Sequence, residues 1–500
     1  MRVHALLWLA CGVFLRLLWL GQPPVEDNSW IRQTQTADAI QSWVEAGHPS
    51  WDAGVSWRGD TGARLVQELP LYNLLVYGAK VAGIPLNAAG RLLSAVLWGV
   101  GFLLVQKIWQ RWLNPRETFW ANLLFVLSPG SIAFGQAIMP EMLVQLLGIG
   151  FVVLLFRYRD QPSLALWWGI VAVGILGVLV KLPGFSHYYL LLACGLVQAH
   201  GAKGLISPRV WLGAGFTLAA LWIWSRYTQS VNAAFFPEWT ANANLQGFLG
   251  RWEDRFQPVY WVRLFFYLLV LVGTPAAWLT MLFGRGGWTR DGWNAPLLVA
   301  WLGGLGLMVL VWGPRTCMGH AYYCLPFLAP TCAIFGKSAG SVLTQGSRPA
   351  WLAFLLAAGI LAGCLPMAAY LLRPDSTLRE TADWMQTNIP PTDLVIIKAN
   401  HSDYTREYPE LPGFSYLSGR KVWIWTPHLA PKERERAVQT SRWIVETRPL
   451  YQLVWWERVR EKIKGHQREP EDITPLLAQQ KAILKHQTPR FRVFQTSQGR

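Results

Sequence analysis

Two acidic positions of this 500-residue chain lie next to apolar segments, where they could act on a hydroxyl substrate. Glu26 and Asp27 follow the first apolar segment, and Glu141 follows Pro140 at the start of a later one. Carboxylates near lipid are costly to desolvate, so they tend to be paired or functional. One carboxylate could take the proton of a hydroxyl acceptor while the second orients that acceptor. Simpler roles stay open: Glu26 and Asp27 as solvated loop charges or a helix cap, and Glu141 as an acid favoured by a helix N-terminus.

Basic and aromatic residues beside other apolar segments could hold a phosphate. Lys181 and Arg315 each lie at the end of such a segment, and an arginine can grip a phosphate with two parallel hydrogen bonds. His320 and Tyr323 lie at the same level and are further candidates. The alternatives are a long basic side chain reaching to the membrane surface and an aromatic belt at the interface.

Other chemistries are disfavoured by the absence of their motifs. The sequence has no glycine-rich phosphate loop, zinc pattern or Ser-His-Asp arrangement, which argues against a nucleotide-driven pump. The six cysteines are spaced neither as a metal site nor as a disulfide framework, so no metal site and no definite cofactor is predicted. The net charge of +16 indicates basic cytoplasmic loops rather than a nucleic-acid partner.

The elements that must position these residues are membrane-spanning helices. Apolar residues make up 52% of the chain and charged residues only 15%, and thirty residues are tryptophan, which favours the membrane–water boundary. A spanning helix needs about 20 mostly apolar residues. Eleven segments qualify as candidates: 3–20, 87–106, 117–136, 141–156, 164–181, 185–199, 209–225, 259–284, 294–312, 321–336 and 350–372.

The distribution of basic residues predicts the orientation. With residue 1 in the cytoplasm, every cytoplasmic loop carries at least two lysines or arginines, whereas the short loops on the opposite side hold only Lys181 and Arg315. This matches the excess of positive charge found in cytoplasmic loops. Eleven crossings then place residues 373–500 outside the cytoplasm.

The predicted fold is therefore a polytopic α-helical membrane domain, 1–372, followed by a small extracytoplasmic α/β domain, 373–500. Within the first, residues 21–86 form an acidic outer loop in which 70–84 is expected to lie along the interface as a helix. In the second, we expect a helix to 388 capped by Ser376 or Thr377 and a buried strand at 394–397. A hairpin within 416–425, a helix near 431–447 and a strand near 451–455 should follow.

Several short motifs resemble the polyprenyl-phosphate-dependent glycosyltransferases of the GT-C type, which include the protein O-mannosyltransferases and the bacterial aminoarabinose transferases. Asp27 with Arg32-Gln33 resembles the acidic motif of their first loop. The remaining motifs occur in the same order as in the family, and they are Glu68 to Tyr72, Gly90 to Ser94, Ser128 to Glu141, Tyr322 to Pro326 and Tyr416 to Trp423.

The resemblance implies a sugar donor linked to a polyprenyl phosphate and a lipid, glycan or protein acceptor. Asp27 would act as base or orient the acceptor hydroxyl, with Glu26 as the other candidate and Glu141 as the second acidic member. Arg32, Lys181 and Arg315 would neutralise the leaving phosphate, and direct displacement would invert the anomeric carbon. The family also implies a bacterial plasma (inner) membrane location.

The sequence departs from the family pattern at two places. Residues 28–31 (Asn-Ser-Trp-Ile) lack the histidine frequent in relatives, and Gln136 stands where a basic residue is expected. These departures leave open a catalytically inactive relative that acts as an assembly or binding partner. Two further alternatives also stay open: a transporter or flippase of lipid-linked saccharides, and an O-antigen ligase or polymerase. The sugar, the acceptor, the metal requirement and the oligomeric state are not predicted.

Overall fold

The computed structural model describes residues 2–26, 29–236, 249–284, 295–344, 350–399, 411–426, 429–447 and 473–497. They form two compact units, each described separately below. The first unit contains Met1–Gly21 and Val66–Leu372, and the second contains Gln22–Leu65 and Arg373–Arg500. The first part of the long outer loop thus groups with the C-terminal residues and not with the helices that flank it.

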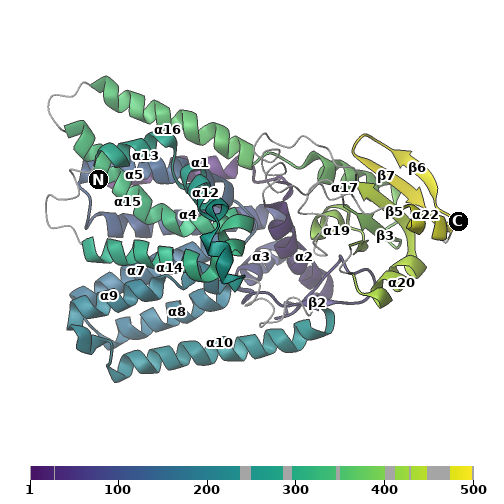
Figure 1. The fold of residues 1–500 in the computed structure, drawn as a ribbon, viewed down its shortest axis with the longest axis horizontal. Coiled ribbons are helices and arrows are strands. Elements are labelled where there is room, and N and C mark those ends of the chain that lie inside the picture. Colours follow the sequence, from purple (N-terminus) through teal and green to yellow (C-terminus); the bar gives the residue numbers. More distant parts are fainter. Residues whose placement is uncertain are drawn as a thin grey trace. The chain divides into compact units, whose positions relative to one another are not determined.

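The first unit is helical throughout (Figure 1). Its helices are α1 (Arg2–Leu17), α3 (Leu71–Val81), α4 (Leu86–Trp109), α5 (Pro115–Leu127), α6 (Pro129–Phe134), α7 (Glu141–Asp160), α8 (Leu164–Phe185), α9 (Tyr188–His200), η1 (Ala202–Gly204), α10 (Pro208–Phe235), η3 (Trp252–Phe256), α12 (Pro258–Tyr267), η4 (Leu268–Val272), α13 (Pro275–Phe283), α14 (Ala295–Gly319), η6 (Ala321–Phe327), α15 (Leu328–Thr344) and α16 (Ala350–Leu371).

Four of the described helices are long and apolar enough to cross a membrane. They are α4, α7, α8 and α16, and the pair formed by Pro258–Val272 and Pro275–Phe283, bent by 99°, would add a fifth if it is one span. The expected segments 3–20, 185–199 and 294–312 correspond to shorter apolar helices. The protein is thus a mostly helical membrane protein, and the total of eleven crossings stays a prediction.

The outward faces of these helices suit a lipid environment. Large apolar side chains are exposed on α1, α10 and α16, among them Phe14, Trp211, Phe216 and Phe354. Exposed apolar surface of this extent marks a membrane or partner interface in a folded protein. The expected interface helix corresponds to α3, which buries Tyr72 and Val76 and exposes Leu74 and Leu75.

Prolines interrupt one of the expected spans and helix α8. Segment 117–136 divides at Ser128 into α5 and α6, because Pro129 cannot donate the hydrogen bond that would continue the helix. Lys181, two residues before Pro183, has non-helical torsion angles (φ −163°, ψ 89°) inside α8. Pro183 has no N–H for the Leu179 carbonyl, and the Leu69 N–H donates to that carbonyl instead, at 2.9 Å.

The second unit contains a five-stranded mixed sheet with helices. Its strands have the order β4 (Val422–Ile424), β3 (Leu394–Lys398), β5 (Ser441–Thr447), β7 (Phe491–Gln495) and β6 (Ile483–Gln487). Strand β3 is parallel to both neighbours, whereas β7 is antiparallel to β5 and β6. The helices are α2 (Trp30–Ala46), α17 (Ser376–Asn388), α19 (Pro412–Ser418), α20 (Pro431–Thr440) and α22 (Thr474–Gln479), and β1 (Ala53–Gly54) pairs with β2 (Arg64–Leu65).

A segment of the first outer loop continues this sheet beyond β4. The Gly59 N–H donates to the Val422 carbonyl at 2.8 Å, and the Val422 N–H donates to the Ser56 carbonyl at 2.9 Å. Arg58 bridges to Trp423 in antiparallel register. An edge strand with unpaired backbone groups is a liability that proteins usually cover, and here residues 56–59 pair with that edge.

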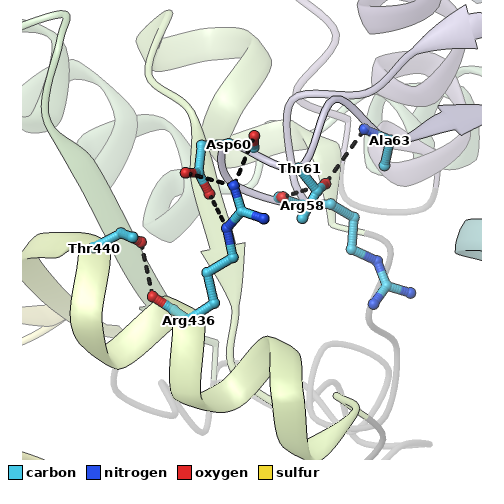
Figure 2. Close-up of polar contacts among 6 residues, drawn as sticks. All are labelled: Arg58, Asp60, Thr61, Ala63, Arg436 and Thr440. Atoms are coloured by element: carbon cyan, nitrogen blue, oxygen red, sulfur yellow. Dashed lines mark hydrogen bonds and ion pairs between the residues drawn. The ribbon is translucent and has the colours of Figure 1, made fainter.

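Ion pairs from α20 reinforce this pairing (Figure 2). Arg436 grips Asp60 with two hydrogen bonds of 2.9 Å, from Nε to Oδ1 and from Nη2 to Oδ2. Arg58 Nη1 donates to Glu433 Oε2 at 2.9 Å. The Thr61 hydroxyl donates to the Arg58 carbonyl and accepts from the Ala63 N–H, which closes the turn that presents Asp60.

Two of the expected C-terminal elements were wrong. The hairpin expected within 416–425 is helix α19 followed by strand β4, because Gly419 adopts a left-handed conformation (φ 65°) that ends the helix. The helix expected at 431–447 ends at Thr440, and the rest is strand β5, which pairs on both sides. Helix α17 and strand β3 lie where they were expected, although Asp375 caps α17. The strand expected near 451–455 lies outside the described residues.

Candidate functional site

A buried ion pair joins two of the candidate residues of the first unit. Lys181 Nζ donates to Glu141 Oε1, and the two side chains are 8% and 4% exposed. Glu141 is the first residue of α7, and Lys181 lies at the break in α8. Because the backbone of Lys181 is not helical, its side chain leaves α8 in a different direction from that of a helical residue. The second carboxylate oxygen of Glu141, Oε2, is buried and accepts no hydrogen bond from the described residues.

Aromatic rings cover the ammonium group of this pair. Lys181 Nζ lies 4.5 Å from the ring centroid of Tyr322 and 5.1 Å from that of Tyr323. His320 stacks on Tyr322, with ring centroids 5.2 Å apart. The negative faces of tyrosine rings attract a cation, which stabilises the charged lysine where water is scarce.

A small pocket opens beside the pair. It is lined by Glu141, Val144, Gln145, Lys181, Gly184, Tyr322, Tyr323 and Pro326. Its walls therefore combine one acid, one base and two phenol rings from α7, α8 and η6. This set can neutralise an anion and can accept or donate protons, which are the capacities needed to handle a phosphate ester.

Hydrogen bonds from α3 and α4 fix the segment that leads into Glu141. The Tyr72 hydroxyl donates to the Gly90 carbonyl at 2.8 Å and lies 3.0 Å from Ser94 Oγ. Ser94 Oγ in turn donates to the Ala137 carbonyl at 2.6 Å. Gly90 packs directly on Ile138, so that an added Cβ would lie 2.6 Å from Ile138 Cγ2. Three short motifs noticed separately in the sequence thus meet here.

Arg91 is a residue that the sequence reasoning named only as part of a motif. It is fully buried, and its Nη1 lies 3.3 Å from Gln136 Oε1. Burial raises the pKa of the Tyr72 hydroxyl. The positive charge of Arg91 lowers that pKa, and the negative charge of Glu141 raises it. The positive charge missing at position 136 is therefore supplied beside it by α4. An arginine within an apolar segment was the available signal.

The first-loop candidates belong to the second unit. Glu26 is 5% exposed, and its Oε2 accepts a hydrogen bond of 2.8 Å from Gln33 Nε2. Arg32 Nη1 lies 3.5 Å from Gln35 Oε1. Asp27 lies outside the described residues, as does the side chain of Arg315, whose backbone belongs to α14. The structure thus brings Glu141, Lys181, His320 and Tyr323 together in the first unit, and Glu26 and Arg32 belong to the second.

A further buried carboxylate, Asp38, was not among the candidates predicted from the sequence. Asp38 Oδ2 accepts from the Ser56 N–H at 3.1 Å, and its Oδ1 contacts the Ser56 hydroxyl. Ser56 Oγ lies 2.7 Å from Ser415 Oγ, which lies 2.9 Å from the Pro412 carbonyl. Burial is the largest influence and raises the pKa of Asp38 to about 7, against the lowering effect of the Ser56 hydrogen bonds. A protonated Asp38 would donate to the Ser56 hydroxyl oxygen. Ser56 would then donate to Ser415, and Ser415 to the Pro412 carbonyl.

Comparison with known proteins gives structural relatives but no sequence relatives. No protein-family model and no curated protein matches the chain. ArnT from Cupriavidus metallidurans matches over 98% of this chain and 97% of its own, with 12% identity and TM-scores of 0.58 bound to undecaprenyl phosphate and 0.60 in the apo state.

Two further solved structures share the architecture. An apo oligosaccharyltransferase from Archaeoglobus fulgidus matches with a TM-score of 0.54 and 12% identity, over 89% of this chain and 69% of that one. The mycobacterial arabinofuranosyltransferase AftD matches with a TM-score of 0.54 and 14% identity, over 99% of this chain and 41% of that one. All three relatives are GT-C glycosyltransferases. This chain therefore has a GT-C-like fold.

Proposed function

We propose that the chain is a membrane glycosyltransferase that moves a hexose or pentose from a polyprenyl-phosphate donor to a hydroxyl acceptor. The observation that carries this proposal is the buried Glu141–Lys181 pair under two tyrosine rings, in a chain with a GT-C-like fold. A buried ion pair costs desolvation energy that the attraction between its charges does not always offset, so such a pair is weak evidence for stability alone. Binding a lipid-linked phosphate is a task that suits the position and charge of Lys181.

The proposed reaction is a direct displacement at the anomeric carbon. The acceptor oxygen forms a bond to that carbon while the bond from the carbon to the phosphate oxygen breaks, and the electron pair leaves with the polyprenyl phosphate. The hydroxyl proton passes to a carboxylate, for which we propose Asp27, with Glu26 as the alternative base. The anomeric configuration inverts because the acceptor attacks opposite the leaving group.

Lys181 has the central electrostatic role in this proposal. The leaving phosphate gains negative charge as the sugar departs, and a fixed cation stabilises that charge best in a site poor in water. Lys181 would exchange Glu141 for the donor phosphate, which would free the Glu141 carboxylate to orient the acceptor. Arg32, Arg315, His320 and Tyr323 are proposed as further contacts of the phosphate.

We propose that transfer occurs on the extracytoplasmic face of a bacterial plasma membrane. The support is the distribution of basic residues, which places the N-terminus in the cytoplasm and residues 373–500 outside it. The acceptor would be a lipid, a glycan or a protein. It would bind on the extracytoplasmic face, to which residues 373–500 would also belong.

Label transfer tests this proposal. Purified chain is incubated with a panel of radiolabelled polyprenyl-phosphate hexoses and pentoses and a membrane lipid extract, in parallel with the Asp27→Asn variant. We expect label to move from one class of donor with wild type and not with Asp27→Asn, while both proteins express equally. Unchanged transfer by Asp27→Asn would remove Asp27 as base. No transfer from any donor by folded protein would favour the transporter or the inactive relative.

A further inference from the structure

Arg255 is a buried arginine whose guanidinium donates to backbone carbonyl groups and lies 4.6 Å from the ring centroid of Trp252. It lies in η3, between α10 and α12, and is 4% exposed. Its guanidinium donates to four carbonyl oxygens: Nη1 to Arg251 at 2.9 Å, Nη2 to Val311 at 2.9 Å and to Leu249, and Nε to Leu310. Four of its five N–H groups are thus in use within the protein, so Arg255 is not poised to grip a ligand.

One of the two α14 carbonyl groups that Arg255 contacts, that of Leu310, is left without a helical donor by a proline. Pro314 has no N–H to donate to the Leu310 carbonyl, four residues earlier. Arg255 Nε takes that place, and the Tyr260 hydroxyl donates to the neighbouring Val309 carbonyl at 2.7 Å. Carbonyl groups at an interrupted helix carry partial negative charge, which a cation stabilises. Arg255 thereby supplies, from outside the helix, the hydrogen-bond donor that Pro314 lacks.

The same stretch of α14 is tied to the break in α8. Trp312 Nε1 donates to Ser186 Oγ at 2.9 Å, and Ser186 ends the helix segment that follows Lys181 and Pro183. Arg315 is the residue after Pro314. The guanidinium of Arg255 therefore supports the α14 backbone next to Arg315. Through the hydrogen bond between Trp312 and Ser186, it also supports the end of α8 that follows Lys181.

We infer that Arg255 is a positioning residue for the phosphate-binding cations. This inference rests on the proposed function for what the cations bind, but the positioning itself is a property of the fold. Loss of the guanidinium removes the donor that replaces the missing N–H of Pro314 at the Leu310 carbonyl, and it removes the added bond to the Val311 carbonyl. The stretch from Trp312 to Gly319 should therefore loosen. The donor phosphate then meets cations at less favourable distances, whereas the groups that act on the acceptor are unchanged.

Hydrogen exchange of the purified full-length chain tests the positioning without any substrate. Arg255→Met is compared with Arg251→Met, which removes an exposed arginine from the same segment. We expect faster amide exchange at 312–319 and 182–187 in Arg255→Met only, because local protection reports local opening. Equal exchange in the two variants would overturn the inference, whatever the protein transfers.

Steady-state kinetics then separate positioning from a general loss of structure. We expect Arg255→Met to lower kcat/KM for the donor between about tenfold and a hundredfold, because the displaced cations bind the donor phosphate and stabilise the leaving phosphate less well. Arg255→Lys, which keeps the charge and fewer hydrogen bonds, should recover part of that kcat/KM. An unchanged kcat/KM in Arg255→Met would contradict the inference, whereas an inactive wild type with the expected exchange pattern would refute only the proposed function.

Discussion

Lys181 and Glu141 are paired across two helices at the one residue of α8 that leaves helical geometry. The two side chains lie 40 residues apart in the sequence and are both nearly inaccessible to solvent. Their contact joins the first turn of α7 to the interruption that Pro183 causes. The pair is therefore held by backbone features, and its charges are already in place before any ligand binds.

Breaking the pair from one side should cost far more stability than removing it whole. Lys181→Met leaves the Glu141 carboxylate buried without its cation, and the expected loss is about 3–5 kcal/mol. The double variant Glu141→Gln/Lys181→Met removes both charges and should recover most of that loss. Thermal unfolding of wild type, Lys181→Met, Glu141→Gln and the double variant in detergent measures the coupling. Additive losses in the double variant would show that the two groups do not interact.

The turn at Gly59 should tolerate no side chain. Its φ of +57° disfavours other residues, and an added Cβ would lie 2.1 Å from the Trp423 ring. Gly62 is a matched control, because its φ is +64° but nothing lies within 4 Å of the added atom. Gly62→Ala should lose about 1–2 kcal/mol from the backbone conformation alone. Gly59→Ala should lose a further ~1–3 kcal/mol from the clash, and equal losses would refute the packing of Gly59 on Trp423.

The stability of the chain should fall as pH rises toward 7 because of Asp38. Its pKa is about 7 in the folded chain and 3.8 as an ordinary carboxyl, so the folded state binds more protons between these values. Stability conferred by the proton is therefore complete below about pH 4 and lost as pH passes about 7, with a slope of at most ~1.4 kcal/mol per pH unit.

Asp38→Asn removes the titrating group and should remove that part of the pH dependence. Melting temperatures of the two proteins between pH 5 and pH 8 measure the difference. The control is Glu45→Gln, since the charge of Glu45 raises the pKa of Asp38 less than burial does. Its profile should stay close to that of wild type. Parallel profiles for Asp38→Asn and wild type would contradict the account of this cluster.

The two ion pairs that hold the first-loop segment on α20 should differ in importance. The side chains of Arg436 and Asp60 are 47% and 37% exposed, whereas that of Arg58 is 6% exposed. Solvent screening leaves exposed pairs with little net effect. We expect Arg436→Met to leave the melting temperature unchanged within error and Arg58→Met to lower it clearly. A larger fall in melting temperature for Arg436→Met than for Arg58→Met would show that the Arg436–Asp60 pair of Figure 2 contributes more to holding residues 56–60 on α20.

Long-range contacts explain what the sequence could and could not predict about the fold. Long apolar runs predicted α4, α7 and α8 because their length and composition suffice. Residues 441–447 were expected to continue a helix, but they form β5 because β3 and β7 lie on either side of them. The pairing of 56–59 with Val422 joins residues more than 350 positions apart, and no local pattern announces such a contact.

The site was predictable as a set of candidates but not as an arrangement. Glu141 and Lys181 were identified because a carboxylate near lipid is costly to desolvate and a lysine at the end of an apolar segment can hold a phosphate. Their pairing depends on the non-helical torsion angles of Lys181, which Pro183 makes possible but does not specify. Arg255 was missed because an arginine in a polar loop is ordinary, and only the carbonyl groups of α14 reveal its role.

The chemical fate of the donor lipid distinguishes sugar transfer from transport of the intact donor. Purified chain in vesicles receives a polyprenyl-phosphate sugar and an acceptor extract, and mass spectrometry identifies the lipid that remains. We expect free polyprenyl monophosphate in proportion to the sugar transferred, with wild type and not with Lys181→Met. Donor that stays intact, whether or not it has moved to the other leaflet, would contradict this expectation.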